Sequence, residues 1–275
     1  MNSRQKIISG GSSRTSQGTI LSKIDNPSVL HAVIVEELKQ NDILTRYKAP
    51  PPVSCSSSPT KTFKVPLEQC PLSSYTLKSG HQVLIPTFLA NAYDLINNSL
   101  ETEGLFRISG NLQSQKRLFA AIQKDPHAIS KEENIHDVTG LVKQFFRDLP
   151  TAILGDKEMQ DTLTQCMKTE IYASRCMRVA LLMLPPLHLY TLTSFLQLLR
   201  KISLHANENK MDSYALAVCV TPNLMPVVDK NELGKLSGFI DIVKILIENA
   251  NKMGVVMPRT LRAYIKKKSG KDEII

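Results

Sequence analysis

A single arginine stands in a short segment whose neighbours suit it for presentation to a ligand. The segment 104–110 begins and ends with glycine, which permits tight turns, and it holds Arg107 between apolar residues. We expect the guanidinium to point outward while the apolar neighbours anchor the segment: Leu105, Phe106 and Ile108. Two interpretations stay open. Arg107 pairs with a local carboxylate, Glu101 or Glu103, or it is offered to a phosphate, whose oxygens match its planar, permanently charged fork.

Two further cations stand four residues apart on one expected helix. Lys143 and Arg147 fall within 138–149, where apolar residues recur at helical spacing, so the two side chains should be neighbours. Like charges at this spacing repel by about 0.2–0.5 kcal/mol. An anion outside the helix would therefore benefit from both. The simpler alternatives are a solvated basic edge, or an ion pair between Arg147 and a neighbouring carboxylate.

An asparagine follows a proline at the end of another apolar segment. The run 213–220 is nearly all apolar, which favours a buried and central helix. We expect Pro222 to stop that helix, and Asn223 to cap the following turn through its own side chain.

The sequence excludes several classes of self-contained enzyme. It has no G-x-S-x-G, H-E-x-x-H or G-x-x-x-x-G-K-[ST] motif. Its six histidines lie far apart, and its five cysteines are scattered without a Cys-x-x-Cys pair. We therefore predict reduced thiols, no metal site, and no nucleotide or other cofactor bound by the chain itself.

The net charge of +9 comes from the two ends of the chain. Residues 1–62 hold 8 basic and 4 acidic side chains, residues 63–250 hold 19 of each, and residues 251–275 hold 7 and 2. A neutral central part is poorly suited to track a phosphate backbone, so we do not expect nucleic-acid binding. The basic ends favour a weak contact with an anionic membrane or an acidic partner, and the candidates are Arg259, Arg262, Lys266, Lys267 and Lys268.

Most apolar residues recur with a helical period, which predicts an all-α fold packed ridge into groove. Strand-like alternation is confined to a short run at 75–85. No apolar run reaches the roughly 20 residues of a membrane helix, and the first residues lack the apolar core of a secretory signal, so we expect a cytoplasmic protein. Five stripes predict the main helices, at 88–96, 138–149, 189–199, 213–220 and 239–247.

Composition divides the chain into one folded domain and two tails. Residues 1–62 predict a mostly disordered tail, rich in Ser, Gly and Gln, with one short amphipathic helix near 28–47 after the start signal at Asn26 and Pro27. Residues 63–258 form the expected domain, and residues 259–275 the expected basic C-terminal tail.

Three segments in this order resemble the Rho GTPase-activating (RhoGAP) domain family. They are EGLFRISG at 103–110, GLVKQFFRDLP at 140–150 and ENKMDSYALAVCVTPNLM at 208–225. The resemblance runs from about Phe63 to about Pro258 and includes Ile85-Pro86 ahead of the first long helix. Each segment alone is moderately specific, whereas three at domain-scale spacing are not expected by coincidence.

The resemblance implies a helical domain that docks on a Rho-family small GTPase and lends it an arginine. The family's arginine finger falls on Arg107, its two helix cations on Lys143 and Arg147, and its asparagine after proline on Asn223. Lys143 and Arg147 would organise the arginine segment and the docking surface, and Asn223 would brace that surface. GTP and Mg²⁺ would be bound by the partner, and the chain would not be an enzyme by itself. We favour a RhoA-like over a Rac-like partner, with recruitment to the membrane or cell cortex.

The sequence departs from the family pattern in two places. Thr151-Ala152 follow Pro150 where the family has an acidic residue and a second proline, and Thr221 precedes Pro222 where the family has Gly or Ala. These departures bear on partner preference and efficiency. The alternative function is a catalytically weak binding module or scaffold that holds a small GTPase without stimulating it.

Overall fold

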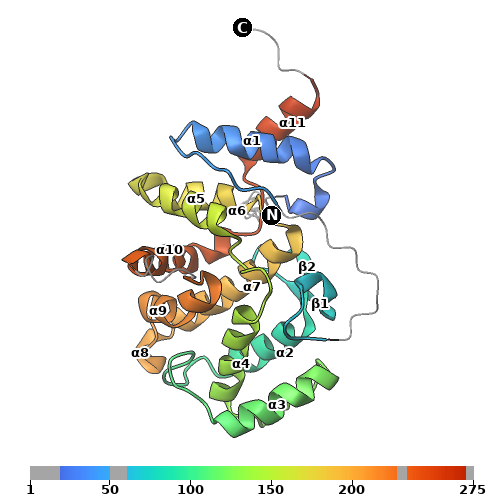
Figure 1. Cartoon of the computed structure of the whole chain (residues 1–275), viewed down its shortest axis with the longest axis vertical. Coiled ribbons are helices and arrows are strands. Elements are labelled where there is room, and N and C mark those ends of the chain that lie inside the picture. Colours follow the sequence, from blue (N-terminus) through green and yellow to red (C-terminus); the bar gives the residue numbers. More distant parts are fainter. Residues whose placement is uncertain (1–18, 50–60, 228–233, 271–275) are drawn as a thin grey trace, which may run out of the picture.

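The structure, a computed structural model, describes residues 19–49, 61–227 and 234–270. Helices dominate these ranges, and the sheet within them is one two-stranded antiparallel hairpin, which confirms the predicted all-α class (Figure 1). No helix in the described ranges is long and apolar enough to cross a membrane. The helices and strands are α1 (Pro27–Lys39), β1 (Leu72–Thr76), β2 (Gln82–Pro86), α2 (Thr87–Asn97), α3 (Leu112–Lys124), α4 (Ile135–Arg147), α5 (Lys157–Met167), α6 (Ala173–Leu181), α7 (Pro186–Ser203), α8 (Ala206–Asn209), α9 (Ser213–Leu224), α10 (Leu236–Glu248) and α11 (Pro258–Lys268), with short 3₁₀ turns at Leu21–Lys23, Leu67–Gln69, Glu170–Tyr172 and Ala250–Lys252.

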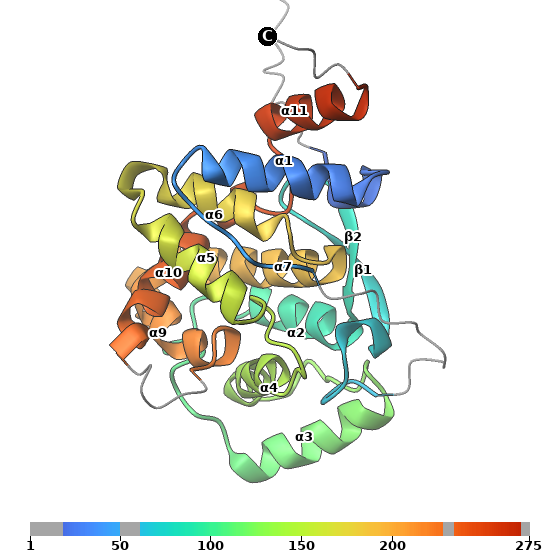
Figure 2. The ribbon, with the colours of Figure 1, turned by 45° about the horizontal axis from the view of Figure 1, so that its top comes forward.

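The centre of the molecule is α7, not α9. Every residue from 188 to 199 of α7 is buried, and the helix lies between α6 and α2 (Figure 2). The all-apolar run in α9 predicts a central position for α9, but Tyr214 and Val218 on that helix are 52% and 43% exposed. Residues 214 and 218 are four apart, so they share one face. That face of α9 is apolar and yet open to solvent.

Helix α9 does not stop at its proline. It continues through Pro222 to Leu224, although a proline inside a helix removes one backbone donor. Pro222 lies close to the end of α9, so few backbone hydrogen bonds of the helix follow it. Two side chains add bonds to carbonyls of the preceding turn: the Thr221 hydroxyl donates to the Ala217 carbonyl at 2.7 Å, and the Asn223 amide donates to the Cys219 carbonyl at 3.4 Å. The departure at Thr221 is thus accommodated within the helix, because its buried hydroxyl finds a partner one turn back.

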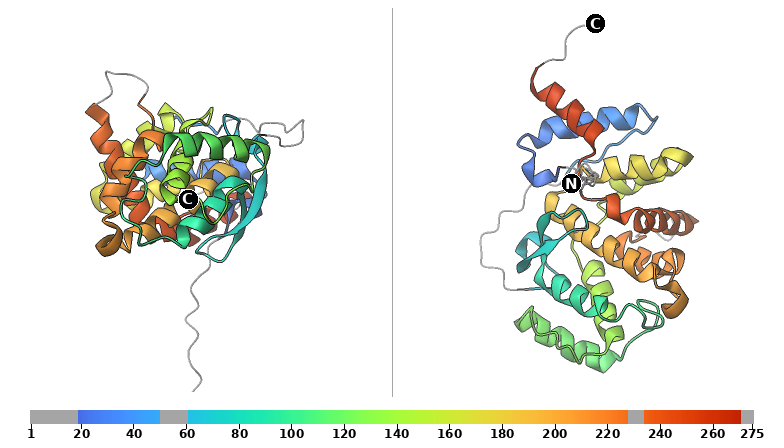
Figure 3. Two further views of the ribbon diagram at one scale, coloured as in Figure 1. Left: turned by 90° about the horizontal axis from the view of Figure 1, so that it is seen from below. Right: turned by 180° about the vertical axis from the view of Figure 1, so that it is seen from behind.

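Helices α1 and α11 pack on each other at one end of the molecule, and we call this pair the terminal layer. Figure 3 shows this layer at the opposite end from α3. Asn26 caps α1 by accepting a bond from the Val29 amide at 3.2 Å, as the start signal predicts. The helix ends at Lys39, well short of residue 47.

The terminal layer corrects the two expected tails in part. Residues 19–49 and 258–268 are ordered and packed, whereas composition predicts tails for 1–62 and from 259 onward. The reason is burial on both sides of the contact, since α1 buries an apolar stripe and α11 buries Thr260 and Tyr264. The remaining parts of the two expected tails, at 1–18, 50–60 and 271–275, lie outside the described residues.

Candidate functional site

The connection from α2 to α3 contains the arginine segment, and we call residues 103–110 the arginine loop. Gly104 and Phe106 both adopt the left-handed conformation, with φ of 70° and 66°. Leu105 and Phe106 are fully buried, as expected, and the Phe106 ring packs edge-on against Phe195 with centroids 5.6 Å apart. Ile108 is 42% exposed, so the expectation that it anchors the loop is wrong. Two buried side chains thus hold the loop, and the residue after them faces outward.

The two glycines of the arginine loop serve different purposes. At Gly104 a Cβ would lie only 2.5 Å from the Ile108 side chain, and this close approach together with the positive φ favours glycine. At Gly110 a Cβ would lie 2.0 Å from a carboxylate oxygen of Asp137 and 2.7 Å from its backbone nitrogen. Gly110 therefore lets the loop pass directly against the first turn of α4.

Arg107 points outward and is only loosely paired. Its side chain is 47% exposed, and one guanidinium nitrogen lies 3.5 Å from a carboxylate oxygen of Glu103, which is itself 67% exposed. The internal ion pair considered for the sequence is thus present. Pairs this exposed contribute about 0–1 kcal/mol, because both groups remain well solvated. Such a contact does not lock the guanidinium in place.

Lys143 on α4 holds the arginine loop through a hydrogen bond to its backbone. Its ammonium group donates to the Phe106 carbonyl at 2.6 Å, one residue before Arg107. Burial lowers the pKa of Lys143; the Cys219 thiol opposes this shift and the like charge of Arg147 adds to it. The structure thus joins Lys143 to the loop, and the proximity to Arg147 follows the predicted spacing of four residues.

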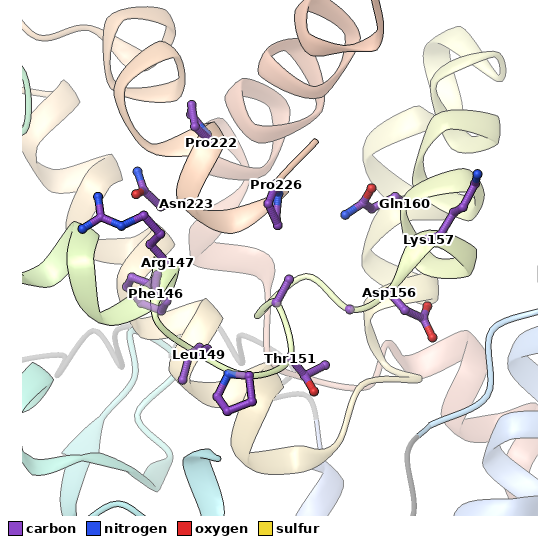
Figure 4. A pocket seen from close by; sticks show the side chains of 13 residues that line it. Phe146, Arg147, Leu149, Thr151, Asp156, Lys157, Gln160, Pro222, Asn223 and Pro226 are labelled. Atoms are coloured by element: carbon purple, nitrogen blue, oxygen red, sulfur yellow. The ribbon is translucent and has the colours of Figure 1, made fainter. Parts of the chain in front are cut away.

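Arg147 and Asn223 line one cavity of about 540 Å³ between α4, the loop 148–156, α5 and α9 (Figure 4). The Arg147 side chain is 61% exposed, and its nearest carboxylate contact is to Asp148 at 3.7 Å. Thr151 and Ala152, which depart from the family pattern, also line this cavity. The remaining lining residues are Phe146, Leu149, Pro150, Gly155, Asp156, Lys157, Gln160, Pro222 and Pro226.

Cys219 also belongs to the site, although the sequence analysis does not single it out. It lies on α9, one turn before Asn223, and is half-buried. Burial raises the pKa of the Cys219 thiol, while the nearby charges of Lys143 and Arg107 oppose that rise. The charges of Lys143 and Arg107 thus both act on Cys219. Because the expected helix stops at Pro222, helical spacing to Asn223 does not indicate Cys219 from the sequence.

The site is a surface rather than an enclosed pocket with its own reagents. It combines an exposed arginine, a half-buried lysine, a second exposed arginine and an amide, carried by the arginine loop, α4 and α9. Among the residues that the structure describes, no three His, Cys, Asp or Glu side chains are grouped so as to hold a metal ion. Chemically, such a surface presents positive charge and hydrogen-bond donors to an anion on another molecule.

Comparison with known proteins identifies the relatives of this fold. The family model described as RhoGAP domain matches residues 86–229. Human Rho GTPase-activating protein 11A is 33% identical over 203 residues, which cover 71% of this chain and 19% of that protein. Human SLIT-ROBO Rho GTPase-activating protein 1 is 26% identical over 198 residues, covering 70% and 18%. The chain thus spans about a fifth of the length of these relatives.

A solved structure agrees with this assignment at the level of the fold. Human Rho GTPase activating protein 15 superposes with a TM-score of 0.59 at 19% sequence identity, over 70% of this chain and 90% of the other. The match to the family model covers more than half of the chain and includes α4, α9 and the arginine loop. This chain belongs to the RhoGAP domain family.

Proposed function

We propose that this protein activates GTP hydrolysis by a Rho-family small GTPase, with Arg107 as an arginine finger supplied in trans. The observation that carries the proposal is the presentation of Arg107: an exposed guanidinium on a loop held by buried Leu105 and Phe106 and by the bond from Lys143. Membership of the family and the names of the relatives support the same activity.

The proposed mechanism is electrostatic. GTP hydrolysis spreads negative charge over the transferring phosphoryl group and the leaving oxygen, and a small GTPase alone lacks a cation placed to meet that charge. An arginine supplied in trans stabilises this transition state, with effects of about 10³ to 10⁵ in rate in GTPase systems. The partner binds GTP and Mg²⁺. This chain contributes the guanidinium and its orientation.

The other site residues have supporting roles in this proposal. Lys143 holds the carbonyl next to Arg107, so it sets the direction of the loop. Arg147 and Asn223 would contact the docked partner at the cavity that they share. The exposed apolar face of α9, with Tyr214 and Val218, extends the same surface and would bury apolar area on docking.

The central experiment is single-turnover GTP hydrolysis with a panel of RhoA-, Rac- and Cdc42-type GTPases. Wild type should stimulate at least one member strongly, and we expect RhoA-type proteins to respond more than Rac-type ones. Arg107→Ala should reduce the maximal stimulated rate at least about 100-fold while binding is largely kept. Arg107→Lys should rescue poorly because an ammonium group lacks the forked geometry.

A matched arginine on the terminal layer serves as the control. Arg262 is exposed on α11, at the end of the molecule away from the arginine loop (Figure 1), so Arg262→Ala should leave stimulation unchanged. If wild type binds a GTPase tightly without accelerating hydrolysis, the protein is a binding module instead. A loss of less than about threefold for Arg107→Ala would also contradict the finger role.

We also propose a weak contact between α11 and anionic membranes, in a protein that is otherwise cytoplasmic. Arg262 and Lys266 are exposed on α11, and the apolar side chain of Ile265 between them is 56% exposed. Lys267 and Lys268, in contrast, engage carboxylates of Glu36 and Asp25. Co-sedimentation with phosphatidylserine vesicles should therefore fall for Arg262→Ala/Lys266→Ala, and an unchanged result would exclude lipid recruitment through α11.

A further inference from the structure

One buried asparagine ties the arginine loop to the body of the domain at a point different from that held by Lys143. Asn209 is the last residue of α8 and is completely buried. Its backbone carbonyl accepts a bond from the Gly104 amide at 2.8 Å. Its side-chain amide donates to the Leu100 carbonyl at 2.7 Å, just before the loop begins. Asn209 therefore bonds the loop itself at Gly104, through its backbone, and the segment that leads into the loop at Leu100, through its side chain.

The same side chain also holds the two helices that flank it. Its amide donates to the Ile202 carbonyl near the end of α7 at 2.9 Å, and its carbonyl oxygen accepts from the Met211 amide at 2.8 Å, just before α9. Lys210 between them adopts the left-handed conformation with φ of 60°. An asparagine has two donors and an acceptor on one short side chain, and here both donors and the acceptor are engaged.

Asn209 and Lys143 thus form hydrogen bonds with different parts of the segment that presents Arg107. Asn209 holds residues 100 and 104, whereas Lys143 holds the carbonyl of residue 106. Asn209 has no exposed surface, so it would act on a partner only indirectly, through the arginine loop and the helix ends that it holds.

We propose that Asn209 is a positioning residue for Arg107. This inference rests on the proposed function, because it assigns Asn209 the task of placing the guanidinium in the productive orientation. Misplacement of a reacting group by about 1 Å costs on the order of 100-fold in rate. Loss of the Asn209 side chain should therefore reduce the maximal stimulated rate and leave the affinity for the GTPase nearly unchanged.

The test compares Asn209→Ala with Thr260→Val, a matched control that also removes a buried side-chain hydrogen bond but lies in the terminal layer. Both are assayed below their melting transitions, with the responsive GTPase identified by the panel. Asn209→Ala should lower the maximal rate about 10- to 100-fold, with the Kd for the GTPase loaded with a non-hydrolysable GTP analogue within threefold of wild type. Thr260→Val should change neither value.

A double-mutant cycle separates positioning from general damage. If Asn209 acts through Arg107, then Asn209→Ala should cost less than threefold in an Arg107→Ala background. The proposal would be overturned if Asn209→Ala lowered the rate by the same factor in the wild-type and the Arg107→Ala backgrounds. A normal maximal rate for Asn209→Ala, whether its Kd is normal or weakened, would also overturn it. If Asn209→Ala does not fold, Asn209→Ser keeps one hydroxyl donor and is tested by the same criteria.

Hydrogen exchange keeps this proposal distinguishable from the proposed function. The amides of Gly104, Arg107 and Ile108 are bonded within or beside the loop, and they should exchange at least tenfold faster in Asn209→Ala but not in Thr260→Val. Unchanged exchange would overturn the anchoring role even if wild type is active. If these amides exchange faster in Asn209→Ala but the wild-type protein stimulates no GTPase, the anchoring role is supported and only the proposed function is rejected.

Discussion

The Glu37 group of the terminal layer and the two arginines of the site, Arg107 and Arg147, pair their charges differently. In the terminal layer the Glu37 carboxylate is 8% exposed and bonds both Arg175 of α6, at 2.9 Å, and Thr260 of α11, at 2.8 Å. At the loop end, Arg107 and Arg147 keep carboxylate contacts of only 3.5 and 3.7 Å and remain about half exposed. Charges that satisfy each other hold helices together, whereas cations left loosely paired are available to an external anion.

The largest effect that we expect from this comparison is on stability, at Glu37. Glu37→Ala removes the carboxylate that joins α1, α6 and α11 and leaves Arg175 and Thr260 without it. Because Arg175 is 38% exposed and can turn to water, the loss should be below that of a fully buried pair, at about 2–3 kcal/mol. Urea denaturation measures this, and melting should fall by about 5–10 °C.

The neighbouring carboxylate provides the control for Glu37. Glu36 is 62% exposed and contacts Lys267 at 3.3 Å, so Glu36→Ala should cost less than about 1 kcal/mol. Neither substitution should change the maximal stimulated hydrolysis rate of folded protein. If the two variants are equally stable, the terminal layer is held by apolar burial alone.

The next effect is on activity, at Lys143. Lys143→Met removes the charge-assisted bond to the Phe106 carbonyl and keeps a similar chain length, so the loop should lose its orientation. We expect the maximal stimulated rate to fall about 10- to 100-fold, or roughly 1.4–2.8 kcal/mol of transition-state stabilisation. Single-turnover hydrolysis checks this, with Lys267→Met from the terminal layer as the control. Equal rates for the two variants would remove the distinction between the two regions.

The helices show how far the sequence alone predicts this fold. The five apolar stripes correspond to α2, α4, α7, α9 and α10. The missed helices do not share one reason. In α3 only Leu118 and Ile122 are buried, whereas α6 buries six of its nine residues and is missed although its sequence is amphipathic. Helix α11 is polar and is ordered by contacts with α1, more than 200 residues away in sequence, as in the bond from Thr260 to Glu37. Local periodicity carries no such information.

The site divides in the same way. Arg107 and the neighbouring pair Lys143 and Arg147 are indicated by local spacing, since glycines flank the first and four residues separate the other two. The contacts of Cys219 and Asn209 depend on tertiary structure, and Asn209 reaches Leu100 across 109 positions. The sequence thus indicates which residues present charge, and the structure adds which residues orient them.

A smaller effect should follow at Glu103, the loose partner of Arg107. Glu103→Gln removes the charge but keeps the shape, so Arg107 gives up a contact worth at most about 1 kcal/mol. We expect the stimulated rate to change by less than about fivefold, toward faster hydrolysis, because the contact no longer competes with the partner's phosphate. The difference in stimulated rate between wild type and Glu103→Gln should be smaller at 300 mM salt than at 50 mM, since salt screens exposed ion pairs. A strong loss of activity would mean that Glu103 holds the finger in its working position.

The smallest effect concerns an exposed carboxylate of the terminal layer, and its sign follows from linkage. The pKa of Asp25 is lowered from 3.8 to about 2, first by the hydrogen bond from Lys268 and then by that from the Tyr264 hydroxyl. A carboxyl whose folded pKa lies below its unfolded value contributes stability above the unfolded value, and this contribution is lost as pH falls from about 4 to about 2. Asp25→Asn should therefore make the melting temperature less dependent on pH over that window. Asp161→Asn, at an exposed position on α5, should leave the pH dependence as in wild type. If Asp25→Asn retains the wild-type slope, Asp25 does not help to fasten α11 to α1, and the buried Glu37 group alone distinguishes this region from the arginine loop.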